Sequence, residues 1–272
     1  MSLISAIDLV KNYGTKKNPI KALGPVNFEI HSKSFTLILG KSGSGKSTLL
    51  NLLAGLDKST SGSLIVQNKN LSTLSQRKLS KYRANIGIIF QFYNLLPNLN
   101  SIENVMMGSW AGGVEGTYEY AEQLLKDFGI DHRAKANVKT LSGGEKQRVA
   151  ICRALVSQPE ILFCDEPTGA LDSTNERQVI KILQGLSQKG LTIIMVTHSQ
   201  EFRSLADQII YLKDGLITDH KNFNHQQIPQ EEPNPNHPSS PNKVHRNPDE
   251  PLPLTNSVAN NDNFNIDPKI NL

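Results

Sequence analysis

The stretch Gly40-Lys41-Ser42-Gly43-Ser44-Gly45-Lys46-Ser47-Thr48 decides the fold of this chain. It follows the segment Phe35–Leu39, which suits a buried strand, and it leads into a leucine-rich segment that suits a helix. A strand, a loop with the spacing G-x-x-x-x-G-K-[ST] and a helix together form a phosphate-binding loop. The glycines allow backbone N–H groups to face phosphate oxygens. We expect Lys46 to pair with the β- and γ-phosphates and Ser47 to bind Mg²⁺.

Apolar runs predict a parallel sheet around this loop. The runs 37–39, 161–163 and 193–196 are apolar at every position and do not alternate. Such strands are covered on both faces, as in a parallel sheet flanked by helices. The expected strands are Ser2–Leu9, Val26–Ile30, Phe35–Leu39, Ser63–Val66, Ile86–Phe90, Glu160–Cys164, Thr192–Thr197, Asp207–Leu212 and Leu216–Thr218.

Helical segments alternate with these strands, which indicates an α/β fold. The stretch from about 92 to 154 is mostly helical and interrupts the alternation, so we interpret it as an inserted helical lobe. The expected helices are Lys46–Leu56, Gln76–Ala84, Ser101–Met107, Tyr118–Phe128, Gly144–Val156 and Asn175–Gln188.

A second pair of glycines lies far downstream, in Leu141-Ser142-Gly143-Gly144-Glu145-Lys146-Gln147-Arg148. Two glycines after a serine leave bare backbone N–H groups at the start of a predicted helix, which is a site for phosphate. One chain therefore carries two phosphate-facing surfaces.

Two carboxylates and a histidine follow buried strands. Asp165 ends the run 161–165 and is placed to hold Mg²⁺ through water, while the next residue, Glu166, can polarise an attacking water. The alternative is that both residues are ordinary surface acids at the end of a strand, but the phosphate-binding loop in the same chain favours the functional interpretation. His198 follows Thr192–Thr197 and would lie at the same sheet edge, where it could contact the γ-phosphate or the water. An ordinary surface or core histidine is the alternative.

Two further positions are less decisive. Gln91 follows the strand 86–90, and its neutral amide can contact Mg²⁺ or water, although spacing alone does not settle this. Tyr13 precedes Gly14 and can stack on an adenine ring or simply pack against its neighbours.

Composition excludes several classes of protein. The chain is 38% hydrophobic with formal charge +4, and no apolar run approaches the ~20 residues that cross a bilayer. Residues 1–5 show no signal-peptide pattern. Lys and Arg are not clustered densely enough for nucleic-acid binding. Cys152 and Cys164 lie in apolar segments, where we expect them to fill the core.

The segment 221–272 differs from the rest. It contains nine of the fourteen prolines and twelve asparagines, but no glycine. Four Lys or Arg against six Asp or Glu give it a charge of −2. Such a composition cannot bury enough surface to offset ordering entropy, so we expect a disordered extension. A partner-binding role is the alternative.

The order of these motifs resembles the ATP-binding subunits of ABC transporters, over roughly residues 2–219. The resemblance rests on Gly40–Thr48 (Walker A), Gln91 (Q loop), Leu141–Arg148 (signature), Ile161–Glu166 (Walker B and catalytic glutamate), Ala170-Leu171-Asp172 (D loop) and His198 (switch histidine). It implies a P-loop NTPase fold of the ABC type, with a mainly parallel core sheet, an antiparallel β subdomain and the helical subdomain at about 92–154. The domain would span 1–220.

The resemblance also implies roles for single residues. Catalysis would fall to Glu166, His198, Lys46 and Gln91. Mg²⁺ would be held by Ser47, Gln91 and Asp165. ATP would be bound by Tyr13, by Gly40, Lys41, Ser42, Gly43, Ser44, Gly45, Lys46, Ser47 and Thr48, by Gln91 and Asp165, and by Ser142, Gly143 and Gly144. The last three would complete the site of a second, head-to-tail copy.

Within the family, the stretches 90–97 and 166–172 look like the branch of lipoprotein-release ATPases, macrolide exporters and the cell-division ATPase. Ser32-Lys33-Ser34 and the glycine-rich loop 112–116 depart from the family pattern, as does the segment after 221. The resemblance implies an ATPase that powers a separate membrane permease from the cytoplasmic face, with residues about 91–97 lining the permease contact. A transmembrane signalling partner is the alternative. A role on ribosomes or DNA is disfavoured, since there is one motif set and no long heptad run.

Overall fold

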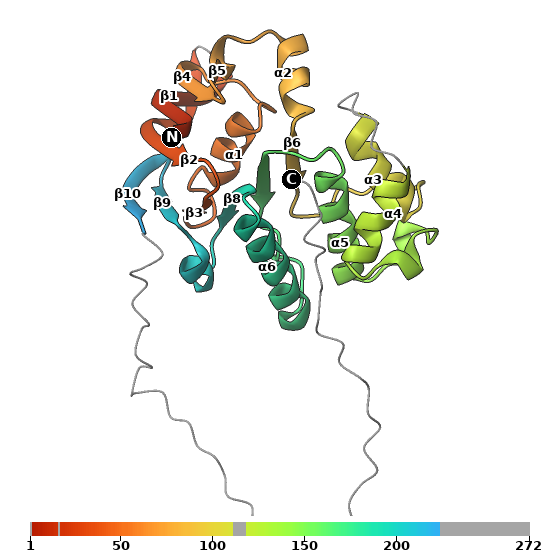
Figure 1. Ribbon diagram of the computed structural model, residues 1–272. Helices are drawn as coiled ribbons and strands as arrows, with labels where there is room; N and C mark the ends of the chain where they lie inside the picture. Colours follow the sequence, from red (N-terminus) through yellow and green to blue (C-terminus); the bar gives the residue numbers. More distant parts are fainter. Residues whose placement is uncertain (1, 16, 111–117, 224–272) are drawn as a thin grey trace, which may run out of the picture.

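The computed structural model describes residues 2–15, 17–110 and 118–223 (Figure 1). Two sheets organise them. The larger sheet has the order β10-β9-β3-β8-β7-β6, in which β10 alone is antiparallel to its neighbour. Its strands are β3 (Phe35–Leu39), β6 (Ile86–Ile89), β7 (Ile161–Asp165), β8 (Thr192–Thr197), β9 (Gln208–Lys213) and β10 (Leu216–Asn222).

The smaller sheet is antiparallel and has the order β2-β1-β4-β5. Its strands are β1 (Ser2–Thr15), β2 (Asn18–His31), β4 (Ser61–Val66) and β5 (Lys69–Asn70). It packs over one face of the larger sheet, with α1 (Lys46–Leu53) between them (Figure 1).

Strand alternation explains why the larger sheet is the middle layer. Along each strand, successive side chains point to opposite faces. Leu37, Leu162 and Ile193 belong to a core shared with the helices of the far side. Ile38 and Ile194 belong to the second core, shared with α1 and the smaller sheet. The doubly apolar strands of the sequence are therefore covered on both faces, as expected.

Helices cover the far face of the larger sheet. Between β6 and β7 the described helices are α3, α4 and α5, which gather at one side of the molecule, while α6 crosses below the sheet (Figure 1). The remaining helices are α2 (Gln76–Arg83), α3 (Ser101–Trp110), α4 (Tyr118–Asp127), α5 (Gly143–Leu155) and α6 (Ser173–Gln188). Short 3-10 turns lie at Leu71–Thr73, Asp131–Arg133, Val138–Thr140 and Glu201–Leu205.

The expected α/β fold with a mainly parallel core sheet and an antiparallel second sheet is confirmed. The element ends differ in instructive ways. α1 ends at Leu53, before Gly55 with φ +62°. α6 begins at Ser173, because the Asp172 carboxylate accepts hydrogen bonds from the N–H groups of Thr174 and Asn175, both at 3.0 Å.

The ends of the strands also differ. β1 and β2 extend into a long hairpin whose outer half is mostly polar and exposed, so alternation does not reveal it. β10 reaches Asn222, since Lys221 and Asn222 pair with β9. The expectation that disorder begins at residue 221 was therefore wrong for Lys221 and Asn222. Residues 224–272 and the loop 112–116 lie outside the described residues.

Both cysteines are buried in the core of the helical face. Burial raises the pKa of each thiol. This agrees with the expectation that they fill the core.

Candidate nucleotide-binding site

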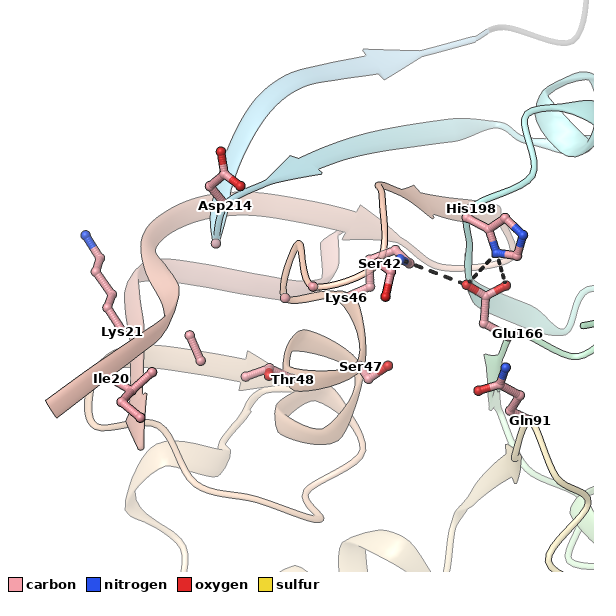
Figure 2. A pocket seen from close by; sticks show the side chains of 14 residues that line it. Ile20, Lys21, Ser42, Lys46, Ser47, Thr48, Gln91, Glu166, His198 and Asp214 are labelled. Carbon is pink, nitrogen blue, oxygen red and sulfur yellow. Dashed lines mark hydrogen bonds and ion pairs between the residues drawn. The ribbon is translucent and has the colours of Figure 1, made fainter. Parts of the chain in front are cut away.

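A cavity of about 760 Å³ opens where the parallel strands of the larger sheet end. The loop after β3, Gln91 after β6, Glu166 after β7 and His198 after β8 all reach it (Figure 2). The lining residues are Ile20, Lys21, Ala22, Ser42, Gly43, Gly45, Lys46, Ser47, Thr48, Gln91, Glu166, His198, Asp214 and Gly215. The fold thus gathers side chains that are far apart in the sequence.

The loop 40–48 has the backbone that phosphate binding requires. Gly43 and Gly45 adopt positive φ angles of 78° and 98°, which disfavour any residue with a Cβ. A Cβ at Gly45 would also lie 2.8 Å from the carbonyl oxygen of Ala22. The loop runs into the N-terminus of α1, whose first turn contains no acidic residue. Its N–H groups and the helix dipole therefore favour an anion here.

Lys46 is buried and its ammonium points along the loop. Its Nζ donates to the carbonyl oxygens of Gly40 at 2.8 Å and Lys41 at 3.1 Å, and lies 3.9 Å from Oε1 of Glu166. The Lys46 ammonium therefore supplies a positive charge at the loop, where a bound phosphate could accept a hydrogen bond from it.

The turn between β9 and β10 supports the loop from behind. The N–H of Gly215 donates to the carbonyl oxygen of Ser44 at 3.0 Å, and the carbonyl oxygen of Gly215 accepts from Gly24 N–H at 2.7 Å. Asp214 and Gly215 both have positive φ, 51° and 77°, as a two-residue hairpin turn requires. The sequence reading missed these residues. The Asp-Gly pair between two strands was the available signal.

Asp165 lies beside the loop at the end of β7. Its Oδ1 accepts a hydrogen bond from the hydroxyl of Ser47 at 3.3 Å. Burial raises the pKa of Asp165, and the neighbouring Glu166 adds to this effect, although the Ser47 bond and Lys46 oppose it. The Ser47 hydroxyl and the Asp165 carboxylate therefore place two oxygen atoms that can bind a metal ion side by side.

Glu166 leaves the strand in a left-handed conformation, with φ +45°. Its N–H still bonds the carbonyl oxygen of Val196 at 3.0 Å, so the residue is fixed against β8. Its carboxylate accepts from the Thr197 hydroxyl at 3.2 Å and contacts Nδ1 of His198 at 3.0 and 3.1 Å. The carboxylate therefore faces the cavity beside the imidazole (Figure 2).

Gln91 also projects into the cavity, at the end that holds Glu166 (Figure 2). A Cβ at Gly169 would lie 3.5 Å from its Nε2. The amide is therefore next to the turn that follows β7.

Tyr13 is not among the residues that line the cavity. Its hydroxyl donates to Oδ2 of Asp57 at 3.0 Å, and the Lys11 ammonium lies 4.7 Å from its ring centroid. Burial, together with Asp57, raises the pKa of Tyr13. Its register partner on β2, Ile20, lines the cavity and is 65% exposed. The sequence reading missed Ile20, because it lies between Pro19 and Lys21, outside any continuous apolar run.

Ser142, Gly143 and Gly144 also lie outside the cavity lining. The hydroxyl of Ser142 accepts from the N–H of Glu145 at 3.3 Å, and the Glu145 carboxylate accepts from the N–H of Ser142 at 2.7 Å, a capping box. A Cβ at Gly144 would overlap the Asn175 side chain. The start of α5 is thus packed against the start of α6, apart from the phosphate loop.

Comparison with known proteins agrees with these motifs. Residues 23–169 match the family described as ABC transporter. Over 222 residues the chain is 42% identical to the macrolide export ATP-binding/permease protein MacB of Mannheimia succiniciproducens, covering 80% of this chain. It spans only 34% of that protein's length.

A shorter relative is covered almost completely. The lipoprotein-releasing system ATP-binding protein LolD of Leptospira interrogans is 40% identical, with 81% of this chain and 92% of that protein aligned. Among solved structures, the dimeric post-hydrolysis state of the ATP-binding cassette MJ0796 bound to ADP and Pi gives a TM-score of 0.74 at 36% identity, covering 80% of this chain and 98% of that one. Within the described residues, no helix is long and apolar enough to cross a membrane.

Proposed function

Because the chain belongs to the ABC transporter family, we propose that it is the ATPase that powers a separate membrane permease, in an exporter or an extractor of membrane-bound substrate. The names of its macrolide-export and lipoprotein-release relatives support export or extraction as the direction of transport. One observation carries the proposal. The loop 40–48, Glu166 and His198 share a cavity, whereas the second phosphate-facing surface at Ser142 lies outside it.

Within the cavity, Lys46 and the N–H groups of the loop 40–48 hold the phosphates of ATP. Glu166 faces the place of the γ-phosphate and takes the proton of the attacking water. His198 holds the Glu166 carboxylate in that position. Gln91 contacts the same end of the nucleotide. Tyr13 stacks on the adenine. Because Ile20 lines the cavity and Tyr13 does not, the Tyr13 ring must rotate toward Ile20 to reach the nucleotide.

The residues at the loop also suit Mg²⁺. The hydroxyl oxygen of Ser47, the carboxylate of Asp165 and the amide oxygen of Gln91 are hard ligands, and the first two are already in hydrogen-bond contact. Bound there, Mg²⁺ would neutralise charge on the β- and γ-phosphates. Few protein ligands are expected, because Mg²⁺ keeps waters and shares the phosphate oxygens.

Two copies bind head to tail in this proposal. The helix start at Ser142, Gly143 and Gly144 then faces the γ-phosphate held by the partner's loop 40–48, so that ATP bridges the two surfaces. Hydrolysis removes the bridge. The dimeric structures of the relative MJ0796 support this arrangement.

The permease contact follows Gln91. Phe92 and Leu96 are 72% and 42% exposed, which is unusual for large apolar side chains close together in sequence. We assign them to the surface that binds the permease, at the cytoplasmic face of the membrane. We take the ATP-binding domain as the predicted span 1–220 together with Lys221 and Asn222, the last residues of β10, and 92–154 as its helical subdomain.

A complementation experiment tests the dimer. Lys46→Ala removes the phosphate cation, and Gly143→Asp places a carboxylate at the second surface, so each variant alone should lose turnover. A mixture should form dimers with one intact site, and roughly a quarter of all sites should then be active by random pairing of two-fold dimers. A mixture as inactive as each variant would show that Gly143 does not act on the partner's site.

A second experiment tests the transport role. Membranes should retain the chain together with an integral membrane protein, and Glu166→Gln should abolish export of that complex's cargo. Recovery of the chain without any membrane subunit contradicts the proposal. Unchanged export with ATP turnover lost would instead favour a transmembrane signalling partner.

A further inference from the structure

Arg153 of α5 joins the loop that carries Gln91 to the helix that begins after Ser142. Its guanidinium donates from one nitrogen to the carbonyl oxygen of Asn94 and from the other to that of Tyr93, both at 2.6 Å. Short bonds from a charged donor in this forked geometry are among the strongest that a side chain makes. No carboxylate within the described residues forms an ion pair with Arg153, and its guanidinium binds these two carbonyl oxygens instead.

The loop is held in a conformation that it would not keep alone. Tyr93 and Asn94 are consecutive left-handed residues, with φ of 62° and 50°. Asn tolerates this region, but a bulky residue such as Tyr adopts it rarely. The tight turn includes Tyr93 N–H to Phe90 C=O at 3.1 Å and Asn94 N–H to Phe92 C=O at 2.6 Å. Both carbonyl oxygens that Arg153 binds therefore belong to a strained turn just after Gln91.

The same turn also contacts the beginning of α5. A Cβ at Gly143 would lie 3.3 Å from the hydroxyl oxygen of Tyr93. Farther along the helix, the backbone at Arg153 packs closely against Gly108 of α3. Burial of the guanidinium lowers the pKa of Arg153. The partly buried guanidinium thus lies against the turn, while the backbone of the same residue is fixed against α3, and loss of the side chain would leave both carbonyl oxygens without this donor.

This inference rests on the proposed function. We propose that Arg153 is a positioning residue that couples Gln91 in one ATP site to the Ser142–Gly144 surface offered to the other. When Gln91 moves toward bound ATP, the turn at Tyr93 and Asn94 moves with it, and the two hydrogen bonds carry α5 along. The coupling element is a rigid turn bonded to a rigid helix, which meets the requirement for a contiguous physical connection.

Three variants separate this role from simple stabilisation. Arg153→Gln removes the fork and the charge, and Arg153→Lys keeps the charge with one donor group. Arg83→Gln is the matched control, because Arg83 also donates to a backbone carbonyl, that of Gly55 at 2.8 Å, but lies on α2. For steady-state ATPase activity of the full chain with MgATP, Arg153→Gln should lower kcat about ten-fold with KM within two-fold. Arg153→Lys should recover part of this loss, and Arg83→Gln should match the parent.

Hydrogen exchange reads the coupling directly. With MgATP, amides of the stretch 41–48 should become protected in the parent and in Arg153→Gln alike. Amides of 141–148 should respond to MgATP in the parent but lose that response in Arg153→Gln. A response at 141–148 that survives in Arg153→Gln, or one that is absent in the parent, would overturn the coupling. Neither outcome touches the complementation of Lys46→Ala by Gly143→Asp, which judges the proposed function separately.

Discussion

The Nδ1 atom of His198 lies 3.0 Å from Oε2 and 3.1 Å from Oε1 of Glu166, so one ring nitrogen serves both carboxylate oxygens. An ionised carboxylate only accepts hydrogen bonds, and therefore Nδ1 carries the proton. The imidazole thus orients the carboxylate.

Replacing His198 should impair hydrolysis more than binding. His198→Ala removes the donor that orients Glu166, and loss of one oriented polar group at such a site costs about 10²–10³ in kcat. ATP affinity should remain within two-fold, because the loop 40–48 and Lys46 are unchanged. Single-turnover hydrolysis and equilibrium ATP binding measure the two effects. His31→Ala, an exposed histidine on β2, serves as control, and a His198→Ala protein with parental turnover would contradict the role.

Glu145 should stabilise the chain in a pH-dependent way. Burial tends to raise its pKa, but hydrogen bonds from Ser142 and the charges of Arg133 and Arg148 outweigh burial, so that the pKa lies below its ordinary value of 4.5. The folded chain thus binds fewer protons there than the unfolded chain. The stabilisation is complete above the ordinary pKa and is lost as the pH falls through the lowered value.

Glu145→Ala should therefore reduce the free energy of unfolding by about 1 kcal/mol at pH 7, the usual cost of a helix cap. The difference from the parent should shrink below pH 4.5. Urea denaturation at several pH values measures it, with Glu122→Ala, an exposed acid on α4, as control. A difference that is the same at pH 3.5 and pH 7 would rule out the charged capping box as its cause.

The two glycines after Ser142 should respond differently to alanine. At Gly144 a Cβ overlaps the Asn175 side chain, whose Nδ2 donates to Asp172 at 2.6 Å. Relieving the overlap disturbs that bond, and overpacking of this kind costs about 1–3 kcal/mol. At Gly143 the nearest atom lies at 3.3 Å, on the flexible end of Tyr93, so Gly143→Ala should be milder. Denaturation compares the two, and Asn175→Ala combined with Gly144→Ala should restore part of the loss.

Gly215 should matter for ATP affinity although it lies on a surface turn. Gly215→Ala introduces a Cβ at φ +77°, 3.0 Å from the carbonyl oxygen of Ala22, and disturbs the bond to Ser44. Displacement of the phosphate loop should weaken ATP binding about ten-fold, equivalent to ~1.4 kcal/mol. Gly190→Ala is the control, because Gly190 has φ +97° with only the Lys33 side chain nearby. Equal ATP affinity for Gly215→Ala and Gly190→Ala would contradict the claim that Gly215 supports ATP binding through the phosphate loop.

The parts of the fold that depend on local sequence were predictable. The strands Phe35–Leu39 and Thr192–Thr197 have the expected bounds, because the apolar runs 37–39 and 193–196 within them end next to the residues that enter the site. The positions of Gln91 and His198 in the cavity follow from parallel strands that share one edge. Roles assigned to them remain predictions.

Other features depend on contacts that no local pattern records. Gly215 reaches Ser44 and Gly24 only after the two sheets have packed together. Arg153 is one of several charged residues of α5, and its role is visible only from its bonds to the carbonyl oxygens of Tyr93 and Asn94. Ile20 lines the cavity because the β1–β2 hairpin is longer than the apolar alternation suggests.

The turn at Gly215 has one more consequence, for protein engineering and for evolution. Both polar groups of its backbone are committed to neighbours on different segments, one on each side. Short exposed hairpin turns usually tolerate added residues, and they are common choices for inserted tags or fluorophores. A single residue added between Lys213 and Leu216 would break both bonds at once. This turn should therefore keep its length among active relatives, and labels should be placed elsewhere.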